Sequence, residues 1–137
     1  MRTLITALTT LAACQAVRKK LDAPERPDTE YLGGRVCLTA LRNRGAAVGL
    51  PIPMKAVMGV SAAGLGLLWS RRKRAPVSTG LLLGGGLSNL LERGCKGEVY
   101  DYVRFASAPG KLRDYVFNLA DFAVFAGAAG MLVRRKK

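Results

Sequence analysis

Histidine is absent from all 137 residues of the chain. Without imidazole, the chain cannot form a Ser-His-Asp site, a Cys-His site or a histidine-ligated metal site. Cysteine is scarce: Cys14, Cys37 and Cys95 include no Cys-x-x-Cys pair, and their number is odd. We interpret them as small apolar or half-buried thiols, and we expect neither a metal nor a cofactor. For hydrolytic chemistry, these absences leave carboxylates, two of which can share one proton.

Acidic residues are also few, with nine against 22 lysines and arginines, and the net charge is +13. Such an excess can indicate nucleic-acid binding. Here the densest basic clusters, 71–74 and 134–137, directly adjoin apolar runs. That placement is typical of cytoplasmic anchors beside anionic lipid. We therefore expect membrane lipids, and no nucleic acid, as partners.

Half of the residues are hydrophobic and the mean hydropathy is +0.15, although 23% of residues are charged. This combination is typical of a small protein that crosses a membrane several times. An apolar helix of about 20 residues spans a hydrocarbon core of ~30 Å. The sequence predicts a membrane all-α fold, in which residues 1–137 form a single integral membrane domain of four transmembrane helices. The expected spans are 3–18, 51–70, 75–93 and 115–133.

The polar segments 21–50 and 94–114 are expected outside the membrane. Within them, the stretches near 35–43 and 98–105 are rich in β-forming residues and partly alternate in polarity. We predict that these two stretches pair in a small β-sheet, a cradle on the outer membrane surface.

Orientation follows from the positive-inside rule. The short link 71–74 and the basic tail 134–137 are expected in the cytoplasm, and four spans then place the N-terminus there as well. All nine acidic residues fall on the outer side. One basic group, Arg18-Lys19-Lys20, follows the first span on the outer face and disagrees with this orientation. The two four-residue clusters outweigh it.

Two carboxylates stand out. Asp121 interrupts an otherwise uncharged run from Tyr115 to Val133, and Asp101 lies in the polar segment before it. A carboxylate within a run of bilayer length is costly and marks a functional site with a nearby partner. If Asp101 and Asp121 lie together, the two carboxyl groups cannot ionise at the same time. The ionised one would then activate water, and the protonated one would polarise a carbonyl. The alternative is that Asp121 caps a helix or pairs with an arginine such as Arg93.

Three blocks resemble motifs of the lipoprotein signal peptidase family, signal peptidase II. Residues 42–47 (Arg-Asn-Arg-Gly-Ala-Ala) resemble the family's Asn-x-Gly-Ala-Ala block. Residues 84–93 (Gly-Gly-Gly-Leu-Ser-Asn-Leu-Leu-Glu-Arg) resemble its Gly-Gly-x-x-x-Asn-x-x-Asp-Arg block. The third block, residues 97–102 followed by 117–121, is similar to the two segments that carry the family's catalytic aspartates. Because the blocks occur in the family's order and spacing, the chain is identified as a divergent member.

The resemblance implies a monomeric intramembrane aspartic endopeptidase of the bacterial cytoplasmic membrane, with its active site at the outer face and both termini in the cytoplasm. Its substrates would be prolipoproteins with an S-diacylglyceryl cysteine, cut just before that cysteine. The implied catalytic pair is Asp101 and Asp121. Asparagines, a glycine and an arginine would support the site or bind substrate: Asn43, Gly45, Asn89, Arg93 and Asn118. Two alternatives stay open, because Asn118 suits a helix N-cap and Arg93 an interface anchor.

The chain departs from the family pattern in its first span. Cys14-Gln15 stands where an Asp-Gln pair is usual, and Glu92 replaces an aspartate. Leu11-Ala12-Ala13-Cys14 also has the form of a lipobox, so the chain could itself be a lipoprotein substrate. A small non-catalytic multi-span membrane protein is the other alternative. Because three more apolar runs follow, we favour the enzyme, and we expect Cys14 to stay unmodified and the first span to be retained.

Overall fold

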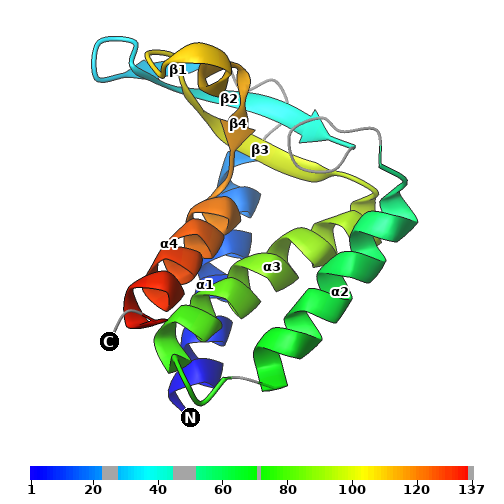
Figure 1. Ribbon diagram of the computed structural model, residues 1–137. Coiled ribbons are helices and arrows are strands. Elements are labelled where there is room, and N and C mark those ends of the chain that lie inside the picture. The colour runs from blue at the N-terminus through cyan, green and yellow to red at the C-terminus, as the bar shows by residue number, and fades with distance from the viewer. Residues whose placement is uncertain (23–27, 45–51, 71, 136–137) are drawn as a thin grey trace.

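The computed structural model describes residues 1–22, 28–44, 52–70 and 72–135. In these ranges a bundle of four α-helices carries a four-stranded antiparallel sheet at one end (Figure 1). The helices are α1 (Arg2–Leu21), α2 (Met54–Ser70), α3 (Pro76–Lys96) and α4 (Leu119–Arg135). The strands are β1 (Thr29–Tyr31), β2 (Val36–Asn43), β3 (Val99–Phe105) and β4 (Val116–Phe117), and a 3-10 helix, η2 (Gly110–Asp114), precedes β4.

The sheet has the order β1-β2-β3-β4. The predicted pairing of the two longer strands is confirmed: Asn43 of β2 lies opposite Val99 of β3, and Leu41 lies opposite Asp101. The edge strands β1 and β4 were not predicted. They have three and two residues, too few for an alternating pattern to appear in the sequence.

The four α-helices of the described residues agree in number with the prediction. Their ends differ from the ends of the apolar runs, and in each case a local contact or conformation explains the difference. α4 begins at Leu119, four residues after the start of the apolar run at 115, because Val116 and Phe117 pair with β3. α3 continues to Lys96 and ends where Gly97 adopts a left-handed conformation with φ 73°. Glycine takes that conformation without a steric penalty and commonly ends helices.

Among the described residues, no single helix combines the length and the hydrophobicity that a membrane span requires. The four transmembrane spans therefore stay a prediction. The start of α1 and the end of α4 lie at the end of the bundle opposite the sheet (Figure 1).

Glycines on α3 bring its neighbours close on two sides. A Cβ atom on Gly84 would lie 2.6 Å from the carbonyl oxygen of Ala7 on α1, and one on Gly85 would lie 2.5 Å from the carbonyl oxygen of Ala120 on α4. Such distances leave no room for a side chain, so α3 forms the centre of the bundle. The contact at Gly85 also fixes the first turn of α4, which carries Asp121.

We predict that Gly84→Ala lowers the free energy of unfolding by about 1–3 kcal/mol, because the added methyl group overfills the α1–α3 contact. Gly64→Ala on α2 is the matched control, since a Cβ there meets no atom within 4 Å. Alanine is the better helix former by about 1 kcal/mol, so this control should be neutral or stabilising. Thermal unfolding of the detergent-solubilised protein measures both. Equal stability of the two variants would show that the α1–α3 contact is loosely packed.

Candidate active site

Asp101 lies in the middle of β3 and is only 4% exposed. Its two carboxylate oxygens accept hydrogen bonds from amide groups: Oδ1 from Asn118 Nδ2 at 2.6 Å and Oδ2 from Asn43 Nδ2 at 3.2 Å. Burial raises the pKa of Asp101 to about 6, and the nearby charge of Asp121 acts in the same direction. The two amide donors and Arg93 oppose this rise. The carboxyl group of Asp101 therefore holds its proton to a higher pH than an exposed aspartate.

Asp121 lies in the first turn of α4 and forms a reciprocal cap with Asn118. Its Oδ2 accepts the backbone N–H of Asn118 at 2.9 Å, while Asn118 Oδ1 accepts the backbone N–H of Asp121 at 3.1 Å. This exchange satisfies N–H groups that a helix start leaves without partners. The remaining oxygen, Oδ1, accepts a hydrogen bond from Asn89 Nδ2 at 2.9 Å. The cap therefore fixes one side of the carboxylate, and Asn89 fixes the other.

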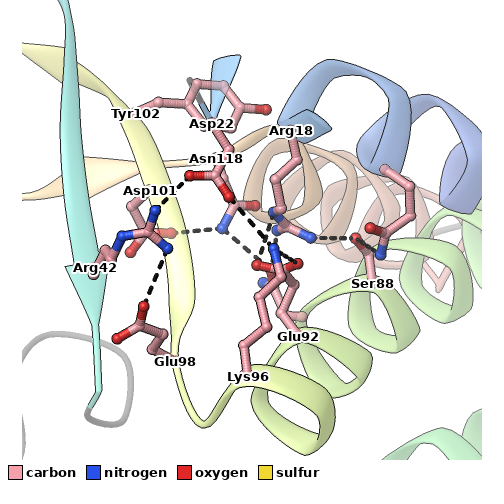
Figure 2. A network of polar contacts seen from close by, with 12 residues as sticks. Arg18, Asp22, Arg42, Ser88, Glu92, Lys96, Glu98, Asp101, Tyr102 and Asn118 are labelled. Atoms are coloured by element: carbon pink, nitrogen blue, oxygen red, sulfur yellow. Dashed lines mark hydrogen bonds and ion pairs between the residues drawn. The ribbon is translucent and has the colours of Figure 1, made fainter. Parts of the chain in front are cut away.

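Asn118 connects the two carboxylates: its backbone N–H donates to Asp121 and its side-chain amide donates to Asp101. It is 1% exposed, and its amide nitrogen donates both to Asp101 Oδ1 and, at 3.2 Å, to Asn89 Oδ1. The alternative that Asn118 caps the fourth helix is confirmed, yet the same side chain also binds Asp101. The structure thus brings Asp101, Asp121, Asn43, Asn89 and Asn118 into one network. Figure 2 shows Asn118 beside Asp101. Gly45 lies outside the described residues.

Arg93 follows Glu92 on α3 and is half-buried. Its positive charge acts on both Asp101 and Asp121. Its Nε is buried and has no hydrogen-bond partner among the described residues. Arg93 therefore brings positive charge to the two carboxylates and keeps a buried donor that is free to bind another group.

Arg18 belongs to the site, although its position in the basic group after the first apolar run gave no indication of it. Arg18 is 2% exposed, and its side chain crosses from α1 to α3 (Figure 2). Its guanidinium donates to Ser88 Oγ at 3.0 Å and to Asn89 Oδ1 at 3.1 Å, and it pairs with Glu92 at 3.5 Å. Glu92, 5% exposed, also pairs with Lys96 at 3.1 Å.

Two tyrosines that flank Asp101 fix β3 to the helices. Tyr102 accepts the backbone N–H of Leu119, the first residue of α4, at 2.9 Å. Tyr100 donates to the carbonyl oxygen of Leu21, the last residue of α1, also at 2.9 Å. These bonds hold the strand that carries Asp101 against the helix that carries Asp121.

The fold is that of a bacterial membrane enzyme. One such enzyme, determined by the in meso method at 1.9 Å resolution, superposes with a TM-score of 0.84, covering 98% of this chain and 92% of that one at 20% identity. A second, determined by the same method at 2.3 Å, gives a TM-score of 0.81, covering 96% and 85% at 21% identity. At these identities the likeness shows the fold alone.

Sequence relatives define the family. The family model of signal peptidase (SPase) II matches residues 5–135. The lipoprotein signal peptidase of Methylobacterium sp. (strain 4-46) is 32% identical, over 95% of this chain and 86% of its own length. That of Mycobacterium avium (strain 104) is also 32% identical, over 97% of this chain and 78% of its own length. The match to the enzyme of Methylorubrum extorquens (strain PA1), at 33% identity, covers 66% of this chain and spans 58% of that protein.

The chain therefore belongs to the signal peptidase II family, which confirms the resemblance of its three sequence blocks. Membership places it among bacterial membrane peptidases that remove signal peptides from lipoproteins.

Proposed function

We propose that the chain is an aspartic endopeptidase of the bacterial cytoplasmic membrane, which cuts prolipoproteins just before their S-diacylglyceryl cysteine. The observation that carries this proposal is the pair of buried carboxylates, Asp101 from β3 and Asp121 from α4. Asn118 joins them, since its side-chain amide donates to Asp101 and its backbone N–H donates to Asp121. A sequence without histidine offers few other acid–base groups for peptide hydrolysis near neutral pH.

The reaction uses one proton shared by the two aspartates. Like charges in a poorly solvated site disfavour double ionisation, so one carboxyl group stays protonated. The ionised member takes a proton from water as the water oxygen attacks the scissile carbonyl carbon. The protonated member donates its proton to the carbonyl oxygen, and the resulting tetrahedral intermediate collapses with proton transfer to the departing amine. The elevated pKa of Asp101, about 6, suits this exchange.

Supporting groups surround the pair. Asn43, Asn89 and Asn118 orient the carboxylates through the hydrogen bonds described above. The unpartnered Nε of Arg93 is suited to bind a carbonyl oxygen of the substrate backbone, because a buried donor without a partner carries a desolvation cost that a ligand relieves. Gly45 stays in the proposal as a substrate-contacting position on the basis of its sequence block alone.

We propose that all four helices span the membrane, that both termini are cytoplasmic and that the chain acts as a monomer. Two observations support this orientation. The start of α1 and the end of α4 at Arg135 lie opposite the sheet (Figure 1), which separates the basic end of α4 from the acidic site. Arg18, which disagreed with the positive-inside rule, is buried against α3 and pairs with Glu92, so it is not an exposed interfacial charge. The site then lies where a lipid-anchored cysteine in the outer leaflet can reach it.

Retention of the first helix is part of the same proposal. Residues before Cys14 fill the close contacts with α3, since Thr6 meets Gly80 and Ala7 meets Gly84. Cys14 itself is 1% exposed. Cleavage before Cys14 would remove these contacts, so the packing favours an unmodified Cys14 and gives no support to the lipoprotein alternative.

Replacing either aspartate should abolish cleavage. We predict that Asp101→Asn and Asp121→Asn each lower kcat by at least about 10²–10⁴-fold, because each removes the base or the proton donor. The assay is cleavage of a lipidated prolipoprotein by the purified protein, with thermal unfolding to check that each variant is folded. Asp28→Asn, at an exposed position before β1, serves as the control and should keep wild-type turnover. Near-normal turnover of either site variant would refute the catalytic pair.

The pH profile should respond to Asn43. Its amide hydrogen bond stabilises the ionised form of Asp101 and so lowers the pKa of that group. Asn43→Ala removes this donor, the pKa of Asp101 rises, and the shared proton is kept to higher pH. We predict that the alkaline limb of kcat/KM moves upward by about one to two pH units, in line with the strength of a hydrogen bond to a charged group. A limb that stays in place or moves to lower pH would contradict the role given to Asp101.

A further inference from the structure

Arg18 is a buried arginine that the proposed mechanism does not use. It contacts three residues of α3, and the contacts differ in length. Those to Ser88 Oγ and Asn89 Oδ1 are 3.0 Å and 3.1 Å, whereas the ion pair with Glu92 is 3.5 Å. Glu92 keeps a second cation, Lys96, at 3.1 Å. Arg18 is therefore bonded most closely to neutral groups, and neutralising Glu92 does not account for its position.

The contact with Asn89 has a consequence for the catalytic pair. A carboxamide can rotate by 180° and exchange its oxygen and nitrogen. With Arg18 and Asn118 both donating to Oδ1, only one orientation satisfies the donors, and in that orientation Nδ2 points at Asp121 Oδ1, 2.9 Å away. The rotated amide would direct its NH2 group at a guanidinium and its oxygen at a carboxylate. Both contacts would be repulsive.

We infer that Arg18 is a positioning residue for the proposed reaction: by binding Asn89 Oδ1, it holds the Asn89 amide in the orientation that donates to Asp121. This inference rests on the proposed function, because it assigns Arg18 a role in aligning one of the proposed catalytic carboxylates. The hydrogen bonds of Arg18 reach Asp121 through Asn89. Removing Arg18 therefore changes the orientation of the carboxylate, besides removing a more distant positive charge, and leaves the substrate contacts in place. It should therefore lower kcat more than it changes KM.

A double-mutant cycle in the purified peptidase assay tests this route. Arg18→Met should lower kcat by about 10–100-fold, the size expected for a hydrogen bond to a charged group, with KM changed less than about twofold. Asn89→Ala should lower kcat similarly. In the Asn89→Ala background, Arg18→Met should lower kcat by less than about a further twofold, because both changes remove the same orientation of Asp121. Lys19→Met, the neighbouring exposed lysine, is the control for net charge and should keep wild-type kcat.

If Arg18→Met does not fold, the cycle is run with Glu92→Gln as its reference, so that in Arg18→Met/Glu92→Gln no buried carboxylate has lost one of its two cations. Losses that multiply in the cycle, a change confined to KM, or wild-type kcat in the variant without Arg18 would each overturn the inference. Asp121→Asn, assayed in parallel, separates the two claims. If it is inactive while removal of Arg18 has no effect, only the role of Arg18 fails. If it is active, the catalytic pair itself fails.

Discussion

The hydrogen bonds of Asn118 are the constraint on which the rest of the site depends. Asp101 is on a strand and Asp121 on a helix, and the chain between them contains a 3-10 helix and a two-residue strand. The cap at the start of α4 fixes Asp121 relative to Asn118, and the amide of Asn118 then binds Asp101. A residue that already satisfies the helix start thus sets the relation between the two carboxylates. An alanine here would remove the side-chain half of the cap and the hydrogen bond to Asp101, and would leave only the backbone N–H bond to Asp121.

Burial makes this arrangement costly, and the surrounding polar groups offset the cost. Carboxylates removed from water need donors, and here they are supplied by carboxamides, which are neutral and leave the pair free to share a proton. The positive charges that balance these carboxylates lie farther away, on Arg93 of α3 and on Arg18 of α1. The close packing at Gly84 and Gly85 brings α1 and α4 near enough to α3 for these side chains to meet. Helix packing and site chemistry therefore depend on the same glycine-lined face of α3.

The sequence contained much of this information. Apolar runs predicted the four helices, alternation predicted the pairing of β2 with β3, and three motif blocks identified the two aspartates and their asparagines. Other features depend on tertiary contacts that no local pattern encodes. β4 takes its conformation from pairing with β3, which shortens α4 relative to its apolar run. Arg18 adjoins two lysines that are exposed, and only the packing of α1 on α3 distinguishes it from them.

The central claim is that this chain itself performs lipoprotein signal-peptide cleavage. The most direct measurement is its expression in bacterial cells that lack their own lipoprotein signal peptidase, followed by mass analysis of a lipidated precursor. The account predicts that the mature lipoprotein appears, with the diacylglyceryl-modified cysteine at its N-terminus. Accumulation of the uncut lipidated precursor, with the protein present and folded in the membrane, would contradict it.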